Sequence, residues 1–329
     1  MNDVASDAGV SLKTVSRVVN AVPTVDRDLV DKVFASIKKL GYRRNGIAAS
    51  LRAGSETRMI GLITADVSNS FYTELASAVA KVARARGFQV IMASSEEDPE
   101  IERALALDLC QRQVSGLIVV PTSADHRYLQ AEMDLGVAVV FVDRPASGLT
   151  ADAILIDNQG GAHSAVERLI ANGHRRIGLL MDSLSIYTMR ERLAGARDAL
   201  AAAGIDDDPA LLVDGVHSPD DAANAVRSML DLADPPTAFL CGNNRSTIGA
   251  LEEVWRRGAS IAIVGFDDFE MSRLLPQPVT IVVSDTAALG TRAAERLFDR
   301  IDGLAAEPTG HLLPTRLVDR GGSRLLAPS

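Results

Sequence analysis

Residues 3–20, DVASDAGVSLKTVSRVVN, have the pattern of two short helices joined at Gly9. Small apolar residues recur at helical spacing on one side of each segment: Ala5, Ala8 and Val10 in the first, and Val15, Val18 and Val19 in the second. Gly9 suits a tight turn, and Ser11 is placed to cap the second helix by accepting a hydrogen bond from a free backbone N–H. The segment therefore predicts a helix-turn-helix.

The outward face of the second helix carries the functional signal. It consists of cationic, hydrogen-bonding and apolar side chains, namely Leu12, Lys13, Ser16, Arg17 and Asn20. Such a face can enter the major groove of DNA and contact base edges. The alternative is a helical hairpin whose polar face is merely solvated.

The next residues favour the DNA hypothesis. Asp26 is placed to cap a third helix whose apolar residues keep helical spacing, and Gly41 is expected to end it. Residues 1–58 contain ten Lys/Arg and six Asp/Glu, a net charge of +4 in a chain of net charge −9, so residues 59–329 carry −13. A basic segment on an acidic chain is expected when only one end meets phosphates.

From Met59 onward, short apolar runs alternate with amphipathic helical stretches. The runs include 59–64, 89–93, 116–120, 137–142, 176–180, 237–241 and 262–265, and the helical stretches include 71–86, 97–113, 159–172, 189–203 and 245–257. Strand–helix alternation predicts an α/β fold with parallel sheets covered on both faces. About 270 such residues are more than a single hydrophobic core usually accommodates, which predicts two lobes with a break near Asp157.

Several classes of protein are disfavoured. No apolar run approaches the ~18 residues of a membrane span, and no signal peptide opens the sequence, so we expect a cytosolic protein. Cys110 and Cys241 lie in apolar contexts far apart in sequence and are expected to be buried free thiols. The five histidines have no metal-ligand spacing, the glycines match no phosphate-loop or dinucleotide pattern, and no nucleophile accompanies a base and an orienting acid. We expect no cofactor, no metal and no catalysis.

The order of motifs along the chain resembles the LacI/GalR family of transcription regulators. In the basic segment the resemblance rests on DVASDAGVS, TVSRVVN, LGYRRN and ASLRAG; in the acidic part it rests on IGLITADVSNSFY, VSGLIVVP, VFVDRP, GHRRIGLL, RLAGARDAL, IVGFDD and LPTRLVDRG. It covers essentially the whole chain. The resemblance implies an N-terminal three-helix helix-turn-helix head, a hinge helix, and an α/β two-lobed core with parallel sheets, like that of periplasmic binding proteins.

The resemblance also implies domain boundaries. The head would span residues 1–44, the hinge helix and linker 45–58, and the effector-binding and dimerisation core 59–329. The chain would cross between lobes near Asp157, Ser284 and Pro314. The first lobe would then comprise about 59–156 and 285–313, and the second about 157–284 and 314–329.

The family's DNA-contacting positions can be carried over residue by residue. Leu12, Lys13 and Arg17 fall where the family reads base edges, with Arg17 the best candidate for a bidentate contact to guanine. Thr14, Ser16 and Asn20 would hold phosphates and register. Segment 46–52 matches the hinge helix, in which Leu51 would wedge between base steps. Three further residues would lie near the DNA: Arg44, Asn45 and Ala48.

The family's effector positions fall on charged, amide, hydroxyl and aromatic residues: Asp66, Asn69, Phe71, Tyr72, Asp143, Arg144, Arg192, Asn243, Asp267 and Ser284. Charged and amide groups can bond paired hydroxyls, and an aromatic face can pack on the apolar face of a sugar ring. Structural alternatives stay open: Asp267 and Arg192 can serve as ion-pair or capping residues, and one of Phe71 and Tyr72 as core.

The sequence departs from the family at several positions. Only Met1 and Asn2 precede Asp3, where about five more residues are usual, so either the start codon lies upstream or Asn2 caps the first helix. Arg44 replaces a usual proline. Asn244 replaces a usual aspartate, Ser284 stands where a long polar group is common, and His217 stands where some members carry an aromatic. The effector of any one member is therefore not transferable.

The predicted function is a DNA-binding transcription regulator, a repressor of carbohydrate uptake or catabolism genes released from a palindromic operator by a small sugar-like effector. Two alternatives remain: a sugar-binding receptor without DNA function, and a corepressor-dependent or activating regulator of the same family. Heads of this kind work as symmetric pairs. No leucine heptad follows Arg320, so we expect a homodimer rather than a tetramer.

Overall fold

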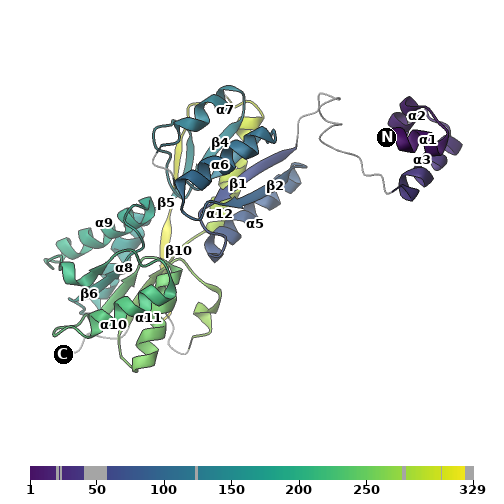
Figure 1. Cartoon of the computed structure of the whole chain (residues 1–329). Coiled ribbons are helices and arrows are strands. Elements are labelled where there is room, and N and C mark those ends of the chain that lie inside the picture. Colours follow the sequence, from purple (N-terminus) through teal and green to yellow (C-terminus); the bar gives the residue numbers. More distant parts are fainter. Residues whose placement is uncertain are drawn as a thin grey trace. The chain divides into compact units, whose positions relative to one another are not determined.

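The computed structural model describes residues 1–19, 22, 24–40, 58–122, 125–275, 279–304 and 306–322. The chain divides into two compact units, Met1–Thr57 and Arg58–Ser329, which we treat separately (Figure 1).

The described residues of the first unit form three helices, α1 (Asn2–Ala8), α2 (Leu12–Val19) and α3 (Arg27–Lys39). Gly9 ends α1 in the left-handed conformation with φ 66°, as a tight turn between two helices requires. The Ser11 hydroxyl accepts from the Thr14 N–H at 3.1 Å, and the Asp26 carboxylate accepts from the Asp28 N–H at 2.9 Å. Both predicted caps are confirmed. Four buried valines form the core: Val4, Val15, Val18 and Val33.

One expectation for this unit was wrong. Asn2 is the first residue of α1 rather than its cap; Met1 holds the cap position, and no side chain caps that end. Phe34, which fits the apolar spacing of α3, is 53% exposed. Helix α1 contacts α3 at Ser36, whose hydroxyl donates to the Val4 carbonyl oxygen at 3.3 Å, and at Lys39, which pairs with Asp7 at 2.7 Å.

The second unit contains two six-stranded sheets. The first lobe's sheet has the order β11-β5-β4-β3-β1-β2 and all its pairs are parallel; its strands are β1 (Met59–Thr64), β2 (Gln89–Ser94), β3 (Gly116–Val119), β4 (Ala138–Val142), β5 (Asp152–Ile156) and β11 (Gly310–Leu313). The second lobe's sheet has the order β12-β10-β9-β8-β6-β7, with only β12 antiparallel; its strands are β6 (Ile177–Leu180), β7 (Leu212–Val213), β8 (Ala238–Cys241), β9 (Ala262–Phe266), β10 (Thr280–Ser284) and β12 (Thr315–Val318). The predicted parallel α/β fold is confirmed.

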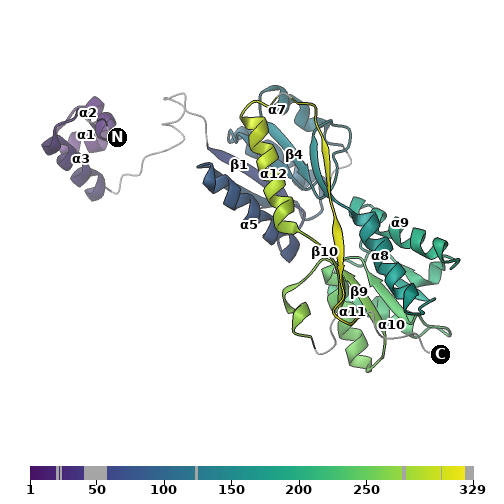
Figure 2. The ribbon, with the colours of Figure 1, turned by 180° about the vertical axis from the view of Figure 1, so that it is seen from behind.

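Helices cover both faces of each sheet. The first lobe carries α5 (Ser70–Ala85), α6 (Pro99–Gln111), η1 (Arg127–Leu129), α7 (Gln130–Asp134) and α12 (Thr286–Ile301); the second carries α8 (Asn158–Ala171), α9 (Tyr187–Ala202), η2 (Pro209–Leu211), α10 (Pro219–Leu230), α11 (Asn244–Arg257) and η3 (Glu270–Arg273). In β1, Leu62 packs in one core cluster and Ile63 in another, because successive side chains point to opposite faces. Helices α5 and α12 lie side by side on one face (Figure 2).

The chain passes between the two sheets three times. It leaves β5 for α8 at Asp157, leaves β10 for α12 at Asp285, and continues from β11 to β12 at Pro314. At the first two crossings the aspartate caps the next helix: Asp157 accepts from Gly160 N–H and Asp285 from Ala288 N–H, each at 2.8 Å. The crossings bring the carboxyl ends of the strands of both lobes toward one another, where ligands of α/β proteins bind.

The cysteine prediction is confirmed, since Cys110 and Cys241 are both free and buried. Within the described ranges, no helix combines the length and the apolar character needed to cross a membrane.

Candidate ligand pocket and nucleic-acid interface

Helix α2 presents the face that the sequence predicts to contact DNA. Lys13 and Arg17 are exposed, and Leu12 is 48% exposed. The Arg17 guanidinium donates to the Thr24 hydroxyl at 2.6 Å, so the loop before α3 orients it. Thr14 and Ser16 are half-buried at the base of this face. Because a neutral hydroxyl is a weaker acceptor than a phosphate, the Arg17 cation remains available to a guanine edge or a phosphate.

The other predicted DNA contacts lie outside the described residues. They are Asn20, Arg44, Asn45, Ala48 and Leu51, and the hypotheses about them remain predictions.

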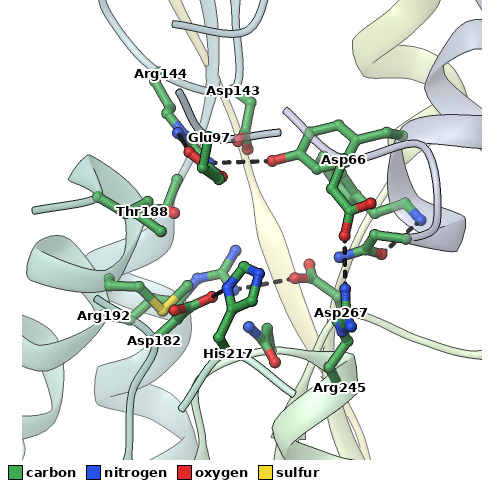
Figure 3. Close-up of a pocket in the computed structure, with 16 residues that line it drawn as sticks. Asp66, Glu97, Asp143, Arg144, Asp182, Thr188, Arg192, His217, Arg245 and Asp267 are labelled. Carbon is green, nitrogen blue, oxygen red and sulfur yellow. Dashed lines mark hydrogen bonds and ion pairs between the residues drawn. The ribbon is translucent and has the colours of Figure 1, made fainter. Parts of the chain in front are cut away.

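The second unit contains a polar pocket between its two lobes (Figure 3). Most of its polar lining residues follow the carboxyl end of a parallel strand. The lining residues are Asp66, Asn69, Phe71, Tyr72, Glu97, Asp143, Arg144, Asp182, Ile186, Thr188, Met189, Arg192, His217, Asn243, Arg245 and Asp267. Nine of the ten residues predicted from the sequence are in this lining.

Asp143 and Asp267 occupy matching positions in the two lobes, directly after β4 and β9. Both have left-handed backbones, with φ 70° and 65°, and each donates its N–H to the neighbouring strand at 2.9 Å, Asp143 to Ile154 O and Asp267 to Val282 O. Non-glycine residues in this conformation often mark functional sites. Burial raises the pKa of Asp143 to about 6, although Arg144 and Arg192 act in the opposite direction.

Arg192 links several elements of the second lobe. Its guanidinium donates to Asp267 Oδ2 at 3.0 Å, to Asn158 Oδ1 at 2.8 Å and to Gly242 O at 2.5 Å, and it lies 3.6 Å from the centre of the Phe266 ring. The Arg192 and Asp267 side chains are 3% and 9% exposed. Arg192 and Asp267 therefore form the ion pair of the structural alternative, and they also line the pocket.

Arg144 organises the first-lobe wall. It donates to both carboxylate oxygens of Glu97, at 2.7 and 2.5 Å, and to the Tyr72 hydroxyl at 3.2 Å. Phe71 and Tyr72 are both buried and pack edge to face, with ring centres 5.1 Å apart. Both aromatic residues therefore belong to the core and to the pocket wall.

Side chains at the start of α11 connect the two lobes across the pocket. Arg245 donates to Asp66 Oδ2 at 2.6 Å and to Ser68 Oγ at 3.2 Å. Asn244 Nδ2 donates to Asn69 Oδ1 at 2.9 Å and to Ser70 Oγ at 3.3 Å. We call these four contacts the interlobe latch. Asn244, the departure from the family's usual aspartate, therefore has a defined partner in the first lobe.

The latch leaves little space for a ligand. The pocket has a volume of about 50 Å³, room for only a few water molecules, since one needs roughly 10–15 Å³ on this measure. A compound with several hydroxyl groups therefore enters only if the lobes separate or lining side chains move.

Replacing Arg245 tests the latch. Arg245→Ala should shift the lobes toward wider separations while lowering the free energy of unfolding by less than about 1 kcal/mol, since the pair with Asp66 is partly exposed. Spin labels on Leu135→Cys and Ala201→Cys, one per lobe, would report the separation, and the buried native cysteines should not react. Arg197→Ala, which breaks a pair with Asp207 inside the second lobe, is the control. An unchanged distance distribution in Arg245→Ala would contradict the latch.

Ser284 is the predicted site residue that the structure places elsewhere. It lines a neighbouring cavity with Glu74, Asp285 and Arg316, among others. The register explains this: Val282 pairs with Phe266, so Ser284, at the end of β10, lies beyond the level of Asp267. The sequence analysis did not predict the pocket roles of Glu97, Asp182, Ile186, Thr188, Met189 and Arg245. Two of them could have been found, because Glu97 and Asp182 are carboxylates that follow the strands β2 and β6.

A three-helix head with a basic exposed helix, combined with a two-lobed core holding a polar pocket, defines a ligand-responsive DNA-binding regulator. Residues 57–320 match the model for periplasmic binding proteins and the sugar binding domain of the LacI family, and residues 1–45 match that for bacterial regulatory proteins of the lacI family. The chain belongs to the LacI family. It is a DNA-binding transcription regulator and not an enzyme, as the family is made of such regulators.

Similar proteins align over nearly the full length. The ribose operon repressor of Haemophilus influenzae is 30% identical over 322 residues, covering 94% of this chain and 96% of that protein. The lac repressor dimer bound to operator and the anti-inducer ONPF is 30% identical, with 99% and 98% of the two chains covered and a TM-score of 0.80. The complex of the transcriptional regulator CelR with cellobiose is 30% identical, with 97% and 98% covered and a TM-score of 0.73.

Proposed function

We propose that this regulator is a homodimeric repressor that binds a palindromic operator in the cytoplasm and releases it when a small polyhydroxylated effector enters the pocket. The observation that carries the proposal is the pocket itself, which takes polar side chains from both lobes and is crossed by the interlobe latch. The repressor and cellobiose-complex relatives support a sugar-type effector and control of carbohydrate genes.

The proposed coupling follows from the distribution of pocket residues. Asp66 and Phe71 belong to the first lobe, and Arg192 and Asp267 to the second. A ligand bound by both sets stabilises one arrangement of the lobes, and it changes DNA affinity only if that arrangement spaces the two hinge segments differently. We infer that ligand unpairs the hinges and releases DNA. Tighter operator binding in the presence of a ligand that stabilises the protein would show corepression instead.

A dimer is proposed because one head offers too small a contact area for a specific site. Two half-exposed apolar side chains of the first lobe support an interface there: Met92, on the edge strand β2, and Ile101, on α6, are 38% and 39% exposed. A mass measurement that finds a stable tetramer at micromolar concentration would contradict the dimer.

Arg17→Ala tests the assignment of α2. The variant should lower affinity for a selected operator by ~1–3 kcal/mol and relax the preference at one base pair per half-site. Gel shifts with genomic fragments would first select the operator; a sugar receptor without DNA function would retard none. Arg27→Ala, which removes the same charge at an exposed position of α3, is the control. If both variants lose affinity uniformly across sequences, Arg17 is a phosphate contact.

A further inference from the structure

The pocket contains more carboxylates than it has cations to balance them. Its lining includes five carboxylates, those of Asp66, Glu97, Asp143, Asp182 and Asp267, and three guanidiniums, those of Arg144, Arg192 and Arg245. With every one of these groups ionised and His217 neutral, the lining is net negative by two charges. Closing the lobes around a neutral compound would leave this excess in a site shielded from water, where unbalanced charge is costly.

Each guanidinium is already paired with one carboxylate. Arg144 binds Glu97 through both oxygens. Arg192 binds Asp267 at 3.0 Å, and Arg245 binds Asp66 at 2.6 Å. An anionic ligand, such as a sugar phosphate or a sugar acid, would therefore have to displace a carboxylate from a close ion pair.

Asp143 and Asp182 are the carboxylates outside these three pairs. Asp143 lies 3.6 Å from the Arg144 Nε and also lies within the electrostatic influence of Arg192, so its charge is partly balanced. Asp182 has no guanidinium partner among the described residues. One of its oxygens accepts from the Ser183 N–H at 2.7 Å, and the other lies 3.3 Å from His217 Nδ1.

The environment of Asp182 suits a cationic donor. Its side chain is 12% exposed, whereas that of His217 is 60% exposed, so the imidazole can be displaced into solvent without breaking a packed core. A second acceptor supports the same conclusion: Asp267 Oδ1 is buried without a hydrogen-bond partner. A protonated amine offers three N–H donors and no acceptor, so it supplies donors together with one of the two missing positive charges.

We propose that the effector is a polyhydroxylated compound that carries a protonated amine, and that Asp182 binds this amine. The inference rests on the proposed function, since it takes the pocket as the effector site. Asp182 follows β6 and His217 follows β7, two neighbouring parallel strands of the second lobe (Figure 3). The amine is then held by the second lobe, while hydroxyl groups are left for Asp143 of the first.

The test uses the full-length protein and sets of hexose derivatives that are cationic, neutral or anionic. D-glucosamine, D-galactosamine and D-mannosamine are each compared by calorimetry with the parent hexose, its 6-phosphate and its aldonate. We expect at least one amino sugar to bind about tenfold or more tightly than its parent, and no binding of the anions. Asp182→Asn should remove that preference, so that the amino sugar binds no more tightly than its parent hexose. Asp206→Asn, which removes an exposed charge of the same lobe, should behave as wild type.

Three outcomes would overturn the inference: a parent hexose or an anion that binds as tightly as the amino sugar, a preference that survives in Asp182→Asn, or no binding by any amino sugar. Operator selection with the same protein sample separates these from failure of the proposed function. If DNA fragments are retarded specifically, only the effector class is wrong. If none is retarded, the regulator assignment itself fails.

Discussion

Arg192→Ala is expected to lower the free energy of unfolding of the two-lobed unit by ~3–5 kcal/mol, because it leaves the buried Asp267 carboxylate without its cation. The same change removes the donors to Asn158 and Gly242 and the packing against Phe266. Urea denaturation of the full-length protein would measure the loss. We also expect the response to effector to disappear, since Asp267 loses the group that orients it.

A double variant distinguishes two causes of the stability loss in Arg192→Ala: the unpaired charge of Asp267 and the packing lost with the arginine side chain. Arg192→Met with Asp267→Asn removes both charges, keeps apolar volume at position 192, and keeps a residue that tolerates the left-handed backbone at 267. It should recover most of the stability lost in Arg192→Ala, because neutral replacement of a buried pair is often tolerated. A loss below about 1 kcal/mol in the single variant, or no recovery in the double one, would contradict this account of the pair.

Val15→Asp is expected to unfold the head and abolish DNA binding while the two-lobed unit retains its own melting transition. Val15 is 0% exposed and its core contains only three other buried valines. A module of this size rarely holds more than about 3–5 kcal/mol of stability, and an unpaired buried carboxylate costs a comparable amount. Calorimetry, circular dichroism and gel shifts would follow the three effects.

Ala35→Asp is the matched control for that variant. Ala35 is exposed on α3, so the substitution adds the same negative charge to the head without burying it. It should leave the head folded and weaken DNA binding only modestly. If Val15→Asp behaved like Ala35→Asp, the valine cluster would not be what holds the head together.

Local chemistry explains why so much of the fold could be predicted from the sequence. Gly9, Ser11 and Asp26 act through contacts within a few residues. Their roles as turn and caps can therefore be predicted from the sequence without knowledge of the tertiary structure. The alternation of apolar runs and amphipathic helices likewise predicts a parallel sheet with helices on both faces. By contrast, Asn2 failed as a cap because the helix begins one residue earlier than the pattern indicates.

Fewer of the pocket residues could be predicted from the sequence, because the pocket is assembled from segments that are distant along the chain. The family resemblance located Asp143 and Asp267, which follow equivalent strands in the two lobes. It did not locate Glu97, which contacts Arg144 from a turn after β2 where Glu96 and Glu97 both have positive φ. Nor did it locate Arg245, whose partner Asp66 is 179 residues away. The spacing of residues along the sequence does not predict either contact.

Footprinting of a genomic fragment retained by the full-length protein tests the central claim most directly. The account predicts protection of a two-fold symmetric site, with its two half-sites on one face of the duplex, and an affinity at least ~10³-fold above that for unrelated DNA. Equal affinity for all fragments, or protection without symmetry, would contradict a paired-head regulator.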